Sequence, residues 1–400
     1  MGFFRQLYLY EIKKILMRKT VWITTGIMLA ATIFVVVSRL AGNYYVDGDV
    51  IDSNYNMFVT DRAYERELSG RAIDDVLLDE MQEAYAKVPE VPNYTLTEEY
   101  QQYARKYSSI RNFVKNILGR TDKEKLLLSI SWEDLYAERE KLLMQDWRTY
   151  MLSDGEIAYW KEKEQEIEKP FVYAYIDGWH RSVTYMYSMN MVLLLLIAVS
   201  LSPVFADEHG RRMDQLILCS RYGKKLLYSA KLAAGISFAI AEVLIFGIAF
   251  VLLTFSVYGT DGFSAPVQLI YLTSHPMTMG ELAVLMYGLL MAAVVLYSIM
   301  VMVISEISKS NVATIGFMVM FLIISLFGNI PEQYRVIGQL FDMLPMVLVT
   351  TWGILDMRLT PIPGGYLTLW QSALILYLIA MVVLSLIGKR CYGWYQIKGR

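Results

Sequence analysis

The charged residues with the most distinctive arrangement lie between two long apolar runs, at positions 189–206 and 232–255. The connection between these runs, 207–231, carries side chains of both signs. They are Arg211, Arg212, Arg221, Lys224, Lys225 and Lys231, with Asp207, Glu208 and Asp214. Short loops rich in Lys and Arg stay in the cytoplasm. We therefore expect a cytoplasmic connection whose charges orient the chain or bind a partner rather than catalyse a reaction.

Apolar residues inside this connection have a rough helical spacing. Met213, Leu216, Ile217 and Tyr222 predict a short amphipathic helix at the membrane surface. Two interpretations stay open. The segment is either a solvated loop with orienting charges or a docking helix for a cytoplasmic partner, in which a protein groove covers Leu216, Ile217 and Leu218.

Glu242 is the one carboxylate deep in an apolar run. A charged group at membrane depth is costly, so we expect this side chain to be protonated, paired or close to a water-filled path. It lies beside small residues at four-residue steps, which let another helix approach closely. These are Ser229, Ala233, Ser237 and Ala241. A structural role at a helix interface and a role in a transport pathway both remain open for Glu242 and its neighbours.

The sequence lacks the residues that phosphate binding, metal binding or catalysis would require. The sequence has no Gly-x-x-x-x-Gly-Lys-Ser/Thr motif, so we expect no phosphate-binding loop and no cofactor in this chain. Its three histidines, His180, His209 and His275, are too scattered for a metal site. The formal net charge of −2 implies no bulk affinity for nucleic acid. We predict that the chain is not itself an enzyme.

The apolar segments define the fold class. Hydrophobic residues make up 55% of the chain, which is typical of a polytopic membrane protein. A membrane-spanning helix needs about 20 apolar residues. Six segments qualify, at about 20–42, 189–206, 232–255, 282–304, 312–328 and 368–387. The short loops obey the positive-inside rule with both termini in the cytoplasm. The sequence thus predicts an all-α polytopic membrane protein with six transmembrane helices.

Residues 1–19 predict an amphipathic helix in the headgroup region of the membrane. Its apolar stripe contains Phe3, Phe4, Leu7, Tyr8, Ile12, Ile15 and Leu16, and its basic side contains Arg5, Lys13, Lys14, Arg18 and Lys19. A cleaved signal peptide is the alternative. However, the apolar core at 21–38 is too long for one, and Arg39 spoils the small-residue cleavage pattern.

Residues 43–186 predict a mostly polar, helical domain outside the cell, because long domains cross the membrane largely regardless of charge. Helical stripes run over 73–88 and 100–117 and end at Pro89 and Gly119. Capping patterns at Thr121–Glu124, Ser131–Asp134 and Ser153–Glu156 mark further helix starts. We expect a long helical hairpin or a small bundle. Residues 187–400 contain spans two to six, with an outer re-entrant or interfacial pair of helices at 329–366.

The connection between spans two and three also resembles a known family. An acidic residue, a Gly, a Leu-rich turn, a basic residue and a Lys entering the next span are similar to the permeases of type 2 ABC exporters. Those positions are Glu208, Gly210, Leu216, Leu218, Arg221 and Lys231. This chain departs from the family at Arg211, where Thr is usual, and at Cys219 and Ser220, where a Pro is usual. The six-span layout strengthens the resemblance, which covers little of 43–186.

The resemblance implies that the connection is a coupling helix that receives motion from a separate ATPase subunit. It assigns this coupling to Glu208, Gly210, Arg211, Arg212, Asp214, Leu216, Ile217, Leu218 and Arg221. It also implies a dimer of permeases with two ATPase subunits that bind ATP and Mg. The spans hold almost no ionisable groups, so an energy source outside this chain fits better than a proton- or sodium-driven carrier.

We therefore expect a permease that exports a peptide or a drug-like, amphipathic substrate across a bacterial cell membrane. Sodium extrusion is the alternative within the same family. A non-transporting sensor or scaffold, with 43–186 as the sensor, is the alternative from another class. It would need an inner signalling domain, and the inner loops are too short to form one.

Overall fold

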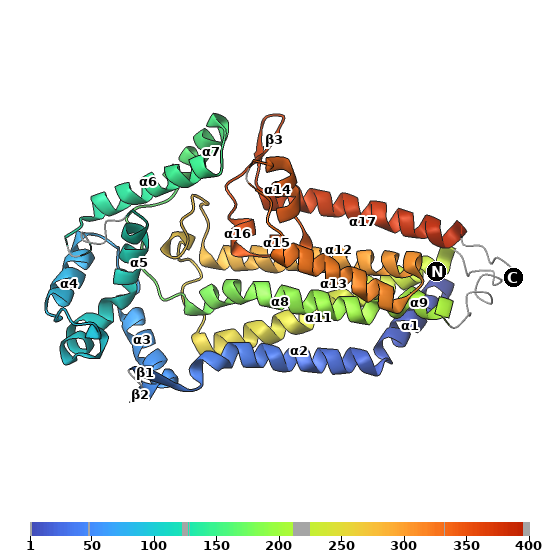
Figure 1. Cartoon of the computed structure of the whole chain (residues 1–400), viewed down its shortest axis with the longest axis horizontal. Helices are drawn as coiled ribbons and strands as arrows, with labels where there is room; N and C mark the ends of the chain where they lie inside the picture. Colours follow the sequence, from blue (N-terminus) through green and yellow to red (C-terminus); the bar gives the residue numbers. More distant parts are fainter. Residues whose placement is uncertain are drawn as a thin grey trace.

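The computed structural model describes residues 2–46, 49–121, 127, 129–210, 225–331 and 333–394. It is mostly helical, and its long helices run side by side in a bundle (Figure 1). The bundle contains α2 (Lys19–Val37), α8 (Asp177–Leu201), α11 (Lys225–Tyr258), α12 (Met279–Ser308), α13 (Asn311–Phe327) and α17 (Leu369–Trp394). Two short helices, α1 (Gly2–Leu16) and α9 (Pro203–Gly210), lie at the end of the bundle where the chain begins and ends.

Five of the bundle helices are long and apolar enough to cross a membrane. The sixth, α13, is apolar but has only 17 residues, short of the roughly 20 that a straight span requires. The prediction of long apolar helices is therefore confirmed for five segments. That α13 also crosses the membrane stays a prediction.

Helix α12 lies in the centre of the bundle and packs against α8, α11 and α17. Its buried positions include Met286, Leu290 and Tyr297, each fully covered. The outer helices keep large apolar side chains exposed, for example Phe34 on α2, Phe327 on α13 and Leu378 on α17. An exposed apolar surface of this kind marks a contact with lipid or protein, and lipid accounts for it if the bundle lies in a membrane.

The predicted boundary between the polar domain and span two, after residue 186, falls inside a continuous helix and stays a prediction. Helix α8 begins at Asp177 and runs without interruption through the aromatic segment to Leu201. Asp177 in the first turn complements the partial positive charge of the helix N-terminus. No proline occurs between 178 and 202, so nothing ends the helix where the membrane boundary was expected.

The segment before α8 folds at the end of the bundle opposite the termini (Figure 1). It contains strands β1 (Asn43–Val46) and β2 (Asp49–Ser53) and helices α3 (Asn54–Leu68), α4 (Asp75–Ala86), α5 (Ser108–Leu118), α6 (Trp132–Thr149) and α7 (Asp154–Gln165). Short 3-10 or π turns also occur in this segment, at 94–96, 100–104, 105–107 and 119–121, and elsewhere in the chain at 38–40 and 267–269.

Two details of this segment differ from the prediction. Strands β1 and β2 pair antiparallel, so the chain is not all-α. Tyr and Val residues flank the Asp47–Gly48 pair, a sequence that favours a hairpin. Of the two predicted arrangements, the helices do not form one long hairpin; they are short and separate, as in the small bundle, because Pro89 and Pro92 follow α4 and Gly119 follows α5.

The predicted helix starts agree with the structure where it describes them. The Ser131 hydroxyl accepts a hydrogen bond from the Asp134 amide at 3.2 Å and begins α6. Ser153 and Glu156 form a reciprocal capping box at the start of α7. The third predicted pattern, at Thr121–Glu124, extends outside the described residues.

Buried polar contacts hold α6 and α7 to the rest of the chain. The Arg139 guanidinium forms a 2.5 Å salt bridge with Glu164 and donates to the Thr273 carbonyl at 2.7 Å. Glu164 also accepts from the Ser274 hydroxyl at 2.7 Å. The Trp160 indole donates to the Met357 carbonyl at 2.6 Å. These bonds connect the predicted outer domain to the link after α11 and to the segment before α17.

The segment 329–366 contains more elements than the predicted pair of helices. It forms α14 (Arg335–Asp342), α15 (Pro345–Leu348), α16 (Thr351–Ile354) and a hairpin of β3 (Thr360–Ile362) and β4 (Gly365–Leu367). All four residues of α15 are buried. The Asn190 amide of α8 donates to the Pro345 carbonyl at 2.8 Å. Non-helical backbone at membrane depth requires such protein partners, and that α15 belongs to a re-entrant segment stays a prediction.

The outer placement of 43–186 is testable by labelling. In a chain without Cys219 and Cys391, single cysteines at Glu90 and Lys161 should react with an impermeant maleimide in whole cells. Both positions are exposed, and neither side chain makes a hydrogen bond or salt bridge to a described residue. A cysteine at Lys389, near the other end of the bundle, should react only after lysis and is the matched control. If the cysteine at Lys389 reacted in whole cells and those at Glu90 and Lys161 reacted only after lysis, the true topology would be the inverse of the predicted one.

Candidate coupling site

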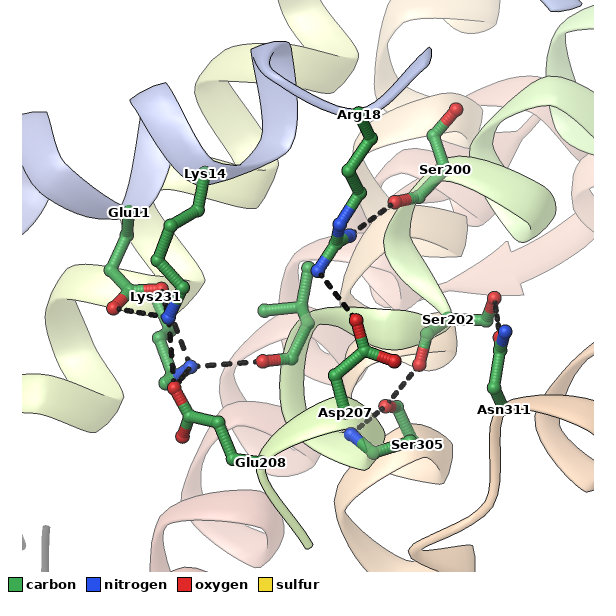
Figure 2. Close-up of polar contacts among 12 residues, drawn as sticks. Glu11, Lys14, Arg18, Ser200, Ser202, Asp207, Glu208, Lys231, Ser305 and Asn311 are labelled. Carbon is green, nitrogen blue, oxygen red and sulfur yellow. Dashed lines mark hydrogen bonds and ion pairs between the residues drawn. The ribbon is translucent and has the colours of Figure 1, made fainter. Parts of the chain in front are cut away.

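A buried ionic cluster lies where α1, α9 and α11 meet, at the end of the bundle that holds the termini (Figure 2). Lys231 of α11 is at its centre, and its side chain is 0% exposed. The Lys231 ammonium donates to Glu208 at 2.8 Å, to the Val204 carbonyl at 2.9 Å and to Glu11 at 3.3 Å. An ammonium has three hydrogens to donate, so Lys231 uses its full capacity.

Lys14 of α1 contacts the same two carboxylates from the other side. Its ammonium lies 2.8 Å from Glu208 and 3.0 Å from Glu11. Two ammonium groups and two carboxylates therefore alternate in a neutral group of four charges. Burial lowers the pKa of Lys14, but Glu208 and Glu11 outweigh this effect and raise it above its ordinary value. Such mutual compensation is what makes buried charges tolerable.

Further polar contacts fix α9 beside this cluster. Arg18, just after α1, lies 3.4 Å from Asp207 and donates to the Ser200 carbonyl at 3.2 Å (Figure 2). On the opposite side, the Ala206 amide donates to the Ser305 hydroxyl of α12 at 3.1 Å. These contacts join α9 to α1 on one side and to the central helix on the other.

The sequence-predicted coupling residues divide into two groups. Glu208 lies in the ionic cluster, and Gly210 is the last residue of α9, with open space around its Cα. The other predicted coupling residues lie outside the described part of the chain. They are Arg211, Arg212, Asp214, Leu216, Ile217, Leu218 and Arg221. Glu208 and Lys231 nevertheless lie near the two ends of this connection, and the structure brings the two into direct contact.

Sequence reasoning missed the contribution of α1. It placed Lys14 and Arg18 on a lipid-facing basic side, but both side chains point toward the bundle (Figure 2). Phe3 and Leu16 of the predicted apolar stripe are exposed, whereas Ile15 is buried. One signal was available in the sequence. Glu11 is the single acidic residue in a basic helix, and an isolated charge of opposite sign indicates a specific partner.

Glu242 lies farther along α11, eleven residues from Lys231 and thus about 16 Å away at the helical rise. Its side chain is buried, and one carboxylate oxygen accepts from the Thr25 hydroxyl of α2 at 3.3 Å. The other oxygen has no hydrogen-bond partner among the described residues. Glu242 is therefore a separate site from the ionic cluster.

Part of the predicted small-residue face of α11 is left uncovered by the described residues. Ser237 is partly exposed, and Ala241 is exposed. The close approach occurs on another face, where a Cβ added at Gly235 would lie 2.3 Å from the Met302 sulfur of α12. Ser237 and Ala241 thus remain available to a second chain, and their predicted role in helix packing stays a prediction.

No set of three or more histidine, cysteine or carboxylate side chains within the described ranges is arranged to hold a metal ion. The His209 imidazole instead lies 3.1 Å from Glu306 of α12. Neither a protein-family model, nor a curated protein, nor a solved structure matches the chain.

Proposed function

We propose that this chain is the permease subunit of an ATP-driven exporter of the type 2 ABC kind. In this proposal a separate ATPase subunit binds the connection 207–231, and two permease copies enclose the path of a peptide or an amphipathic, drug-like substrate. The ATP and Mg belong to the partner. The termini and the ionic cluster face the cytoplasm, and 43–186 lies outside the cell.

The contact between Glu208 and Lys231 carries the proposal. Glu208 belongs to the helix that enters the connection, and Lys231 belongs to the helix that leaves it. Lys14 and Glu11 add α1 to the same group of charges. A force applied to the connection would therefore reach α1, α9 and α11 together rather than bend one loop.

Away from the ionic cluster at its end, the described part of the bundle holds few buried ionisable groups, which supports an energy source in another subunit. Glu242 is buried with one partner among the described residues, the neutral Thr25. A hard cation takes several oxygen ligands, and these two side chains supply too few for a sodium site. This composition favours an organic substrate over sodium extrusion.

The proposal predicts a docked ATPase. The tagged chain, purified from its native membrane in mild detergent, should carry a protein with a phosphate-binding loop. Changing Leu216 and Leu218 together to Asp should abolish this co-purification, because charged side chains would replace the apolar anchors of the contact. The control is Lys161→Asp in the predicted outer domain, which should leave it intact. If the Leu216→Asp, Leu218→Asp chain inserts normally and retains the ATPase, the connection is not the docking site.

A further inference from the structure

A polar cavity of about 490 Å³ lies at the other end of the bundle, between α3 and the ends of α2, α8 and α11. Its walls carry guanidinium and carboxylate groups together with aromatic rings. They include Arg39, Asp61, Glu65, Asp177, Arg181 and Tyr258. The cavity is thus at the junction between the long apolar helices and the predicted outer domain, which is the level of the outer membrane boundary in the proposed topology.

Several of the charges around this cavity are already paired within the protein. Arg181 forms a 3.0 Å salt bridge with Asp177, one turn earlier on α8. Arg105 forms a 2.8 Å salt bridge with Asp61. Arg62 donates to the Val257 carbonyl at 3.2 Å. These contacts hold the cavity walls in place and pair most of the charged side chains that line them.

Two ionisable side chains on the cavity walls, the partly buried Glu65 and the exposed Arg39, have no polar partner among the described residues. No hydrogen bond or salt bridge reaches the Glu65 carboxylate or the Arg39 guanidinium, and the two do not contact each other. Burial, together with Asp177 and Asp61, raises the pKa of Glu65 to about 8, and Arg181 only partly opposes this effect. An ammonium group beside Glu65 would favour the ionised form of this carboxyl, and an anionic group beside Arg39 would pair with the guanidinium.

A second, apolar crevice lies one helical turn deeper in the same bundle. Its volume is about 40 Å³, too small for a ligand of its own, and its walls are almost entirely apolar. Val35 of α2 and Tyr185 of α8 line the crevice, and each lies four residues from a residue of the polar cavity, Arg39 and Arg181. Residues four apart stack on one face of a helix. The same helices therefore present a charged cavity above an apolar crevice.

We propose that this pair of cavities binds a phospholipid of the outer leaflet through a phosphoethanolamine headgroup. Arg39 pairs with the phosphate, Glu65 pairs with the ammonium, and the start of an acyl chain enters the crevice beside Val35. A guanidinium is well suited to a phosphate because its planar fork donates two parallel hydrogen bonds. This inference rests on the proposed membrane placement and does not depend on the ATPase.

Binding can be measured on the full chain, purified in detergent and stripped of lipid. Phosphatidylethanolamine, phosphatidylglycerol and soluble phosphoethanolamine are then added separately, and bound molecules are counted by native mass spectrometry. We expect phosphatidylethanolamine to bind tightest. Arg39→Gln should weaken the binding of both lipids by about tenfold or more, while Glu65→Gln should weaken only that of phosphatidylethanolamine. Arg148→Gln, at an exposed arginine of α6, is the matched control.

A substitution in the apolar crevice distinguishes a lipid ligand from soluble phosphoethanolamine. Ala31→Phe adds a ring to its wall and should reduce binding of phosphatidylethanolamine without changing the Arg39 and Glu65 groups. If soluble phosphoethanolamine binds as tightly as the lipid and Ala31→Phe has no effect, the ligand is a soluble molecule and the lipid proposal is wrong. The proposed site would be wrong if the original chain bound all three probes equally and the Arg39→Gln and Glu65→Gln variants bound them as the original chain does.

Discussion

Replacement of Lys231 by Met is expected to destabilise the folded chain strongly. The substitution leaves Glu11 and Glu208 buried beside each other, with only Lys14 to balance them. Removing one partner of a buried ion pair typically costs about 3–5 kcal/mol, because the remaining charge is left uncompensated. A markedly lower unfolding temperature in detergent should result. Lys13→Met, at an exposed position of the same basic segment, should leave the unfolding temperature nearly unchanged.

A second substitution separates charge balance from packing. Glu208→Gln alone leaves two ammonium groups against Glu11, so it should also be destabilising. The combination of Lys231→Met with Glu208→Gln restores a neutral cluster of Lys14 and Glu11, and it should recover a large part of the lost stability. If the double variant is as unstable as the sum of the two single variants, the four charges do not act as a unit.

The other large effect is expected at Arg139, in the predicted outer domain. Its side chain is 1% exposed, and it joins Glu164 to the Thr273 carbonyl. Arg139→Met should cost about 3 kcal/mol, toward the lower end for a broken buried pair, since Lys169 remains 2.9 Å from Glu164. Hydrogen exchange should then accelerate in α6, in α7 and around 273–275, while α12 stays protected.

Arg148→Met provides the comparison, because Arg148 lies exposed on the same helix. We expect no change in hydrogen exchange for this variant. Uniform acceleration throughout the bundle in Arg139→Met would mean that Arg139 supports the whole fold rather than the attachment of α6 and α7.

The elements that follow from local rules were predictable from sequence. Long apolar segments became α2, α8, α11, α12 and α17, since a continuous apolar run of this length has few alternatives to a helix. Ser131 and Ser153 marked helix starts because a capping side chain acts within one turn.

Elements that depend on distant contacts were not predictable. The start of α8 at Asp177 was not predicted, because aromatic side chains at a membrane interface give no signal for where a helix begins. The fourfold cluster of charges also escaped prediction. It joins Glu11 to Lys231 across 220 positions, and a helical pattern shows which residues share a face but not what covers that face. Lys14 therefore looked like a headgroup contact from its basic neighbours alone.

ATP hydrolysis by the complex in lipid vesicles tests the central claim most directly. If the chain is an ATP-driven permease, the chain together with its co-purified ATPase should hydrolyse ATP much faster than the ATPase alone. The chain with Leu216→Asp and Leu218→Asp, added at the same concentration, should give no stimulation above the rate of the ATPase alone. A rate that is the same with the original chain, with the doubly changed chain and without any permease would contradict the assignment of this protein as an ATP-driven permease.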